Sequence, residues 1–336
     1  MKIHKMVFIN SMMMGTMIAV SSYSWMGMWM GLEINLLSII PLFNESKNML
    51  ASESAMKYFI TQAMASLVLL TAVIMLLNTE EFINPFMNFS FSMMMNTALM
   101  TKLGAAPVHF WFPEVIEGLN WTNSLILLTW QKIAPMMIIM NTKMNKLFMV
   151  SIIVSCLVIS TIMAFNQISL RKIMAFSSIN HIAWMLSTLF MSLSTWTIYF
   201  LAYSFMNINI TMIFNLTKSF FINQIHSMMN QDKIIKFSLM LNFLSLGGIP
   251  PLMGFFPKWL VVNWMTNQSM MLLTAIMIST TLIMLFIYIR IMLSSMMMFT
   301  NEPKMPPIKN MNQTLMLSNM ILISSLILCT MVFNMM

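Results

Sequence analysis

Apolar runs of about twenty residues recur along almost the whole chain, and this pattern leaves few folds open. A helix needs about twenty apolar residues to cross the hydrocarbon core of a bilayer. The sequence predicts an all-α polytopic membrane protein of about eleven transmembrane helices, forming a single membrane domain over residues 1–336. The runs lie at about 6–22, 25–43, 56–78, 86–112, 122–141, 147–166, 170–192, 194–216, 237–265, 270–294 and 314–336.

Charge is scarce and unevenly distributed. Charged residues make up 8% of the chain and hydrophobic residues 59%, far from the composition of soluble domains. The net charge of +8 does not indicate a nucleic-acid partner, because the basic residues sit in short loops, where they orient membrane helices. Twelve of them fall on one side and only Lys143 and Lys146 on the other, which predicts an inner N-terminus and an outer C-terminus. The twelve are Lys2, Lys5, Lys47, Lys57, Arg171, Lys172, Lys218, Lys233, Lys236, Arg290, Lys304 and Lys309.

Two short motifs indicate an internal repeat. The stretches 103–107 and 246–250 share the pattern Leu-Gly-x-x-Pro at a spacing of 143 residues. The same spacing lays the first five predicted helices on the next five. Residues 1–146 and 147–294 are therefore predicted to be two five-helix repeats, followed by a loop and a final helix over 295–336. Five crossings per repeat make the copies inverted in the membrane, as in many secondary transporters whose corresponding broken helices mark the transport site.

The fourth helix of each predicted repeat contains proline. Pro107, Pro250 and Pro251 lack the backbone donor and are predicted to break their helices. The carbonyl groups freed there need partners from protein or water inside the bundle. Pro135 is predicted to be an ordinary kink.

Four charged residues lie inside the predicted helices and well away from their ends: Glu33, Lys102, Lys132 and Lys258. A charge at bilayer depth is costly, so it faces a protein interior or a wet path, and ion or proton movement is its commonest use. Desolvation penalises the charged form of an amine, so such lysines are candidates for proton exchange. A nearby glutamate favours the charged form, which makes a changing Glu–Lys distance a switch of proton affinity. Static ion pairs or snorkelling side chains are the alternative.

Other titratable residues are weaker candidates. His109 and His181 lie at depth, where histidine is the usual proton carrier near neutral pH, although a packing role is equally open. Arg290, near the inner end of its helix, is predicted to snorkel towards water. Glu114 and Glu117 are predicted to lie at a solvated loop end.

Binding motifs for redox cofactors and metals are missing from the sequence. It contains no G-x-G-x-x-G, no G-x-x-x-x-G-K-[S/T] and no cluster of metal ligands, so no cofactor and no metal are expected on this chain. Cys156 and Cys329 lack C-x-x-C or Cys/His spacing and are predicted to be small core residues. Methionine accounts for 49 residues, often where Ile or Leu would serve. A mitochondrial code that reads an isoleucine codon as methionine would produce this drift.

Several stretches together resemble the chain 2 family of NADH:ubiquinone oxidoreductase, the respiratory complex I. The most specific are 101–115 (TKLGAAPVHFWFPEV) and 247–259 (GGIPPLMGFFPKW). The stretches 29–35 and 130–135 match too, and 177–184 is shared more widely with Mrp-type sodium/proton antiporter subunits. The resemblance covers essentially the whole chain. The bacterial members have three further N-terminal helices that this chain and the shorter animal form lack, so neighbouring subunits are expected to cover that face.

The resemblance implies an antiporter-like, proton-pumping subunit of the membrane arm. It implies that Glu33 and Lys102 form an ion pair at the proton input. It also implies that Lys132 and His181 belong to a central hydrophilic axis with His109 beside it, and that Lys258 is the terminal lysine. Expected partners are other membrane-arm subunits, including further antiporter-like ones, and membrane lipids, with no nucleic acid. NADH, FMN, iron–sulfur clusters and ubiquinone are expected on other subunits. The implied location is the mitochondrial inner membrane, with the N-terminus in the matrix and the C-terminus in the intermembrane space.

Two alternatives stay open at this stage. A free-standing Na⁺/H⁺ secondary antiporter would share the broken helices and buried lysines, but it would act without a partner complex. A purely structural membrane subunit would hold its charges as static pairs. Removal of a charge would then impair assembly without a selective loss of pumping.

Overall fold

The computed structural model describes residues 3–44, 48–80, 85–142, 145–224, 233–250, 252–297, 319–321 and 324. These residues are mostly helical and contain no β-strand; their one extended pairing is an isolated bridge between Ser169 and Phe221. The predicted all-α class is therefore confirmed. Pro251, Cys329 and most of the predicted final helix over 314–336 lie outside the described residues.

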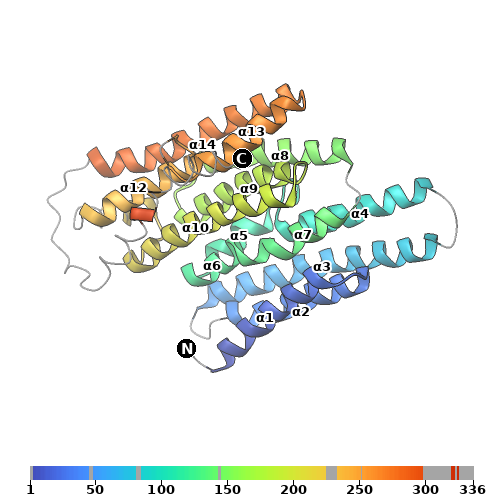
Figure 1. Ribbon diagram of the computed structural model, residues 1–336. Helices are drawn as coiled ribbons and strands as arrows, with labels where there is room; N and C mark the ends of the chain where they lie inside the picture. The colour runs from blue at the N-terminus through green and yellow to red at the C-terminus, as the bar shows by residue number, and fades with distance from the viewer. Residues whose placement is uncertain are drawn as a thin grey trace. The chain divides into compact units, whose positions relative to one another are not determined.

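The chain divides into two compact units, Met1–Cys156 and Leu157–Met336. In the first unit α1 packs on α2, α3 packs on α2, α4 and α5, and α7 contacts α1 and α4 (Figure 1). The Ser24 side chain caps α2 by accepting a hydrogen bond from the Gly27 N–H at 3.2 Å. The elements of this unit are α1 (Ile3–Ser21), α2 (Trp25–Phe43), α3 (Met49–Glu80), α4 (Pro85–Leu103), α5 (Trp111–Gly118), α6 (Trp121–Leu128), the 3₁₀ turn η1 (Trp130–Lys132), α7 (Ile133–Asn141) and the first part of α8 (Lys146–Ala164).

The second unit is built in the same way, from long helices and one interrupted pair. Here α10 packs on α9, α12 and α13, and α14 packs on α12 and α13. Besides the end of α8, its elements are α9 (Leu170–Thr188), α10 (Leu193–Thr217), α12 (Lys233–Gly247), α13 (Phe255–Asn267) and α14 (Met271–Met297).

Six stretches of helix in the described part of the chain are long and apolar enough to cross a membrane. They are Trp25–Phe43, Met49–Leu77, Trp121–Asn141, Lys146–Ala164, Leu193–Thr217 and Met271–Leu293. Three of the predicted runs are interrupted. Two of them, 86–112 and 237–265, were predicted to contain a break, and each forms two helices with a loop between. The third, 122–141, contains η1, which the sequence did not predict.

Glycine, and not proline, ends the two broken helices. Gly104 and Gly248 have φ of +74° and +82°, a conformation that glycine adopts without strain. After α4, the Ala105 N–H bonds to the Met100 carbonyl at 3.0 Å. After α12, Ile249 bonds to Leu244 in the same way at 3.3 Å. Both ends are Schellman caps, after which a proline commonly follows.

The two left-handed glycines have a spacing that differs by one residue from that of the sequence motifs. Gly104 and Gly248 are 144 residues apart, and so are the starts of α5 and α13. The motif spacing of 143 pairs Gly104 with Gly247, whereas the second of the two adjacent glycines takes the left-handed conformation. At a spacing of 144, Pro113-Glu114 aligns with Pro257-Lys258.

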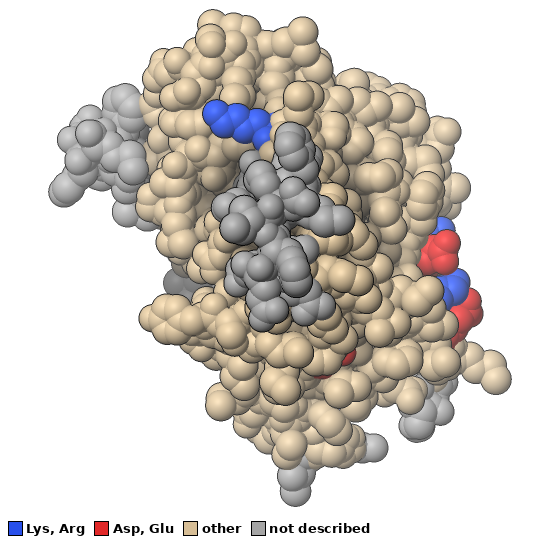
Figure 2. All heavy atoms as spheres, turned by 90° about the vertical axis from the view of Figure 1, so that its right-hand side faces the viewer, with Lys and Arg blue, Asp and Glu red and all other residues tan. Residues whose placement is uncertain are grey.

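The distribution of side chains suits a bilayer. Large apolar side chains such as Met14, Met17 and Leu37 are 60–62% exposed, whereas Lys132 and His181 are at most 2% exposed. Figure 2 shows a face on which charged side chains are few among a largely uncharged described surface. An apolar exterior around a polar interior is expected for helices surrounded by lipid.

Candidate functional site

Lys102 lies in the last turn of α4, directly before the first break. Its side chain is 7% exposed. The carbonyl groups at this helix end are satisfied by side chains from elsewhere in the unit. Trp111 Nε1 donates to the Thr101 carbonyl at 3.2 Å, and Gln62 Nε2 donates to the Lys102 carbonyl at 3.4 Å. These contacts fix the backbone that carries Lys102.

The loop after this helix end is fixed to α8. Ser155 Oγ donates to the Ala106 carbonyl at 3.2 Å, and the Ala106 N–H donates to Cys156 Sγ at 3.1 Å. Cys156 is fully buried, as predicted, and serves as a hydrogen-bonding as well as a packing residue. The break therefore has a defined conformation.

Lys132 is the most deeply buried of the three lysines, at 1% exposed. It ends η1, where the helix changes from α to 3₁₀ geometry before α7 begins, and Pro135 falls in the first turn of α7, where a missing donor is tolerated. The predicted run 122–141 is thus a stretch long enough to cross a membrane that contains a 3₁₀ turn. A 3₁₀ stretch inside a long helix often marks a functional hinge.

Lys102 and Lys132 line the same small cavity, of about 10 Å³, inside the first unit. This volume is near the lower limit for holding one water molecule. Among the described residues, no hydrogen bond is made by the Lys102 amine. Lys132 Nζ lies 5.9 Å from the centre of the Phe112 ring. The lining residues are Tyr58, Lys102, Leu103, Trp111, Phe112, Leu127, Gln131 and Lys132.

Glu33, on α2, is half-buried and close enough to Lys102 for an electrostatic interaction. In the described structure the two make no ion pair within 4.0 Å, so the direct contact that the resemblance implies is not formed in this conformation. Glu33 Oε1 is buried and has no hydrogen-bond partner among the described residues. Such a carboxylate oxygen is costly to bury and can accept a proton or a donor.

A polar cluster that sequence reasoning missed joins α2 to the Lys132 segment. Asn35 Nδ2 donates to Gln131 Oε1 at 2.9 Å, and Gln131 Nε2 donates to Asn35 Oδ1 at 3.0 Å. Tyr58 Oη also donates to Gln131 Oε1, at 3.4 Å. The available signal was the occurrence of amides inside apolar runs, one of them adjacent to Lys132.

His109 lies in the loop between α4 and α5. It is 1% exposed, and its Nδ1 lies 3.1 Å from the Pro107 carbonyl. Its Nε2 is buried without a partner among the described residues. Its ring is tilted against that of Phe110 at 4.4 Å between centres. His109 does not line the cavity between the two lysines.

Lys258 caps the end of α12 at the second break. Its Nζ donates to the carbonyls of Leu246 and Gly247 at 3.0 and 3.1 Å, and it lies 5.8 Å from the centre of the Trp184 ring. An ammonium has three N–H donors and a neutral amine has two. Both protonation states can therefore satisfy the two carbonyls, and only the third proton is free to leave.

His181 is held by aromatic residues of α10 that the sequence did not point to. Its Nδ1 lies 2.9 Å from Tyr199 Oη, and its ring centre is 5.0 Å from that of Tyr203. His181 and Tyr199 are both at most 2% exposed. Because Trp184 follows His181 by one helical turn, one side of α9 presents both the histidine and the ring that Lys258 faces.

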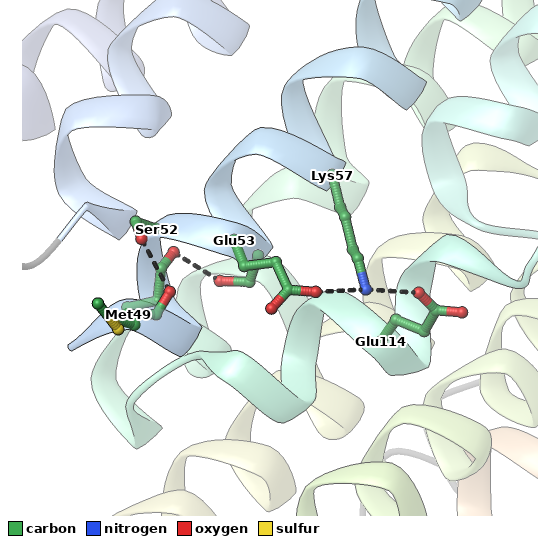
Figure 3. A network of polar contacts seen from close by, with 7 residues as sticks. Met49, Ser52, Glu53, Lys57 and Glu114 are labelled. Atoms are coloured by element: carbon green, nitrogen blue, oxygen red, sulfur yellow. Dashed lines mark hydrogen bonds and ion pairs between the residues drawn. The ribbon is translucent and has the colours of Figure 1, made fainter.

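Glu114, 144 residues before Lys258 in the sequence, lies in a different environment from that lysine. It lies in α5, 56% exposed, and accepts from Lys57 Nζ at 3.0 Å; Glu53 contacts the same amine at 2.9 Å (Figure 3). The predicted exposure is correct, but the residue belongs to a helix and is ion-paired. Exposed pairs of this kind contribute little to stability.

A family described as "NADH:quinone oxidoreductase/Mrp antiporter, TM" matches residues 22–285. NADH-ubiquinone oxidoreductase chain 2 of Anopheles gambiae is 44% identical over 99% of this chain and 98% of its own length. The protein of the same name from Equus asinus is 36% identical, covering 96% of this chain and 95% of its own.

Solved structures share the fold at low identity. A chain of respiratory complex I from Thermus thermophilus superposes with a TM-score of 0.87 and 18% identity, over 97% of this chain and 78% of that one. A chain of the Mrp complex from Dietzia sp. superposes with a TM-score of 0.77 and 14% identity, over 90% of this chain and 62% of that one.

Proposed function

Because this chain belongs to the NADH-ubiquinone oxidoreductase chain 2 family, we propose that its buried lysines and histidines are the groups through which the complex moves protons. The chain is an antiporter-like membrane subunit of the proton-pumping oxidoreductase. The proposed proton-carrying residues are Glu33, Lys102, Lys132, His181, Lys258 and His109.

The cavity shared by Lys102 and Lys132 carries this proposal. Lys102 and Lys132 line one water-sized cavity, through which a single water molecule can pass a proton from one amine to the other. Lys102 has no acidic partner within 4.0 Å among the described residues, so it is not held in a static salt bridge. Glu33, near Lys102 but out of contact, can change its influence on that lysine with a small movement of α2.

In the second unit, the third proton of Lys258 is the mobile one. The other two N–H groups hold the end of α12, so a proton can be gained or lost there while the helix end stays capped. His181, whose Nδ1 lies 2.9 Å from Tyr199 Oη, is the proposed histidine carrier of this unit. The coupled redox reaction, oxidation of NADH by ubiquinone, supplies the energy from other subunits.

The remaining assignments belong to the same proposal. We place the chain in the mitochondrial inner membrane, with the N-terminus in the matrix and the C-terminus in the intermembrane space. We further propose eleven crossings, arranged as two inverted five-helix repeats with a final helix. NADH, FMN, the iron–sulfur clusters and ubiquinone are assigned to other subunits, and further antiporter-like subunits to the surroundings of this one.

The test substitutes Lys132→Met and measures protons translocated per NADH oxidised in closed membrane vesicles. Lys146→Met, at the exposed start of α8, is the matched control. We expect a lower ratio for Lys132→Met alone, at normal abundance of the assembled complex. An assembled variant with an unchanged ratio would refute the relay. Loss of assembly with a normal ratio in the remaining complex would favour a structural subunit.

A separate experiment addresses the free-standing antiporter. Gently solubilised membranes are run on a native gel stained for NADH dehydrogenase activity, and peptides of this chain are located by mass spectrometry. We expect them in the NADH-oxidising band. Their migration away from that band would support the antiporter instead.

A further inference from the structure

A cavity within the second unit takes no part in the proposed relay. Its volume is about 440 Å³, within the range of small-molecule and lipid-headgroup sites. It is lined by Phe165, Asn166, Gln167, Ile168, Ile173, Ile222, Asn223, Ile287, Arg290 and Ile291.

The walls of the cavity are held together by backbone hydrogen bonds. The loop that joins α8 to α9 pairs with the segment after α10. Leu170 N–H donates to the Phe220 carbonyl at 2.9 Å, and Ile222 N–H donates to the Ile168 carbonyl at 3.2 Å. On α14, Phe286 stacks on Phe165 at 5.9 Å between ring centres. Two loops and a helix therefore form a cavity of fixed shape.

The floor of the cavity is apolar and its rim is polar. Ile173, Ile287 and Ile291 are at most 5% exposed and form buried lining. Arg290 is exposed, and no described residue makes a hydrogen bond or ion pair with its guanidinium. The amides of Asn166 and Asn223 add neutral hydrogen-bonding groups that are also exposed.

Arg290 lies in the C-terminal part of α14, three residues before Leu293. Arg171 and Lys172 in the first turn of α9 and Lys218 after the end of α10 make this end of the unit basic. Basic cavities between membrane helices suit anionic headgroups.

We infer that this cavity binds an anionic phospholipid. The phosphodiester bonds to the Arg290 guanidinium and to the rim amides, and the start of an acyl chain covers the isoleucine floor. Arginine suits this role because its planar fork donates two parallel hydrogen bonds to phosphate oxygens. The inference depends on the chain lying in a membrane and not on the proton relay.

The test uses a phosphatidylglycerol analogue with a photoreactive group on its acyl chain, bound to the purified complex. Cross-linked peptides are located by mass spectrometry. We expect labelling in 165–173 and 287–291, reduced about fivefold by Arg290→Gln and preserved by Arg290→Lys. Lys146→Gln is the control for an exposed basic residue outside the cavity, and abundance on a native gel shows that each variant assembles.

Competition identifies the ligand. Unlabelled phosphatidylglycerol should displace the probe, whereas phosphatidylcholine and inorganic phosphate should not. Displacement by inorganic phosphate would make this a site for the free anion. Equal displacement by phosphatidylcholine would show that the net negative charge of the lipid does not determine binding. Either result, or an absence of labelling at these peptides in the unmodified complex, would overturn the inference.

Discussion

Replacing Gly248 by alanine should destabilise the end of α12 and the loop that follows it, and the structure gives the size of the effect. The residue has φ of +82°, where a side chain costs about 1–2 kcal/mol. A Cβ there would lie 2.9 Å from Lys258 Cδ and 3.0 Å from its Nζ. The lysine has to move, which endangers its two hydrogen bonds, worth about 0.5–1.5 kcal/mol each. Together the local structure should lose roughly 2–5 kcal/mol.

Amide hydrogen exchange in the purified complex measures this loss directly. A change of 2 kcal/mol accelerates exchange about thirtyfold, since each 1.4 kcal/mol is a factor of ten. Peptides covering 244–258 should therefore exchange at least about thirtyfold faster in Gly248→Ala. Proton pumping per NADH should fall in the same variant, because Lys258 is displaced.

Gly247→Ala is the matched control. Its Cβ would lie 3.2 Å from the Leu285 side chain, which can move, and its backbone is helical, where alanine is favoured. We expect little change in exchange. Equal acceleration of exchange in the two variants would show that neither the contact with Lys258 nor the left-handed conformation requires glycine at position 248.

Three further substitutions test the surrounding contacts. Gln131→Leu leaves the buried Asn35 amide unpaired and should destabilise the complex by about 1–3 kcal/mol, measured by thermal inactivation. Adding Asn35→Leu should recover part of this loss, and a double variant without recovery would argue against the amide pair. Tyr199→Phe removes the Nδ1 partner of His181 and should lower protons pumped per NADH at normal assembly; an unchanged ratio would make Tyr199 a packing residue. Lys57→Gln should change neither ratio nor stability, because its ion pairs are exposed, and a clear defect in either would contradict this.

Burial of the lysines was predictable from the sequence because it depends on depth alone. Lys102, Lys132 and Lys258 lie inside long apolar stretches, and the structure leaves them at most 8% exposed. A local pattern suffices for such a prediction. The membrane class follows from the same local information.

Contacts between distant segments were not predictable in this way. Asn35 and Gln131 are 96 residues apart, and nothing in either neighbourhood specifies the other. The two amides meet because α2 and η1 fold together. The same holds for Tyr199 and His181, whose partnership depends on the packing of α9 against α10.

The exact position of the second helix end was ambiguous for a different reason. Gly247 and Gly248 are both able to end a helix, and sequence matching chose the first. In the structure Lys258 occupies the space beside Gly248, where a side chain would collide with it. The lysine thereby selects the residue that has to be glycine.

The hydrogen bonds from Lys258 to two carbonyl groups suggest how the charge of this lysine can be detected by spectroscopy. Since an amine and an ammonium both satisfy them, the backbone from 244 to 258 should look the same whether or not the lysine is charged. The charge itself faces the Trp184 indole at 5.8 Å, so it should shift that ring's emission. We therefore expect Trp184 emission to report the proton occupancy of Lys258.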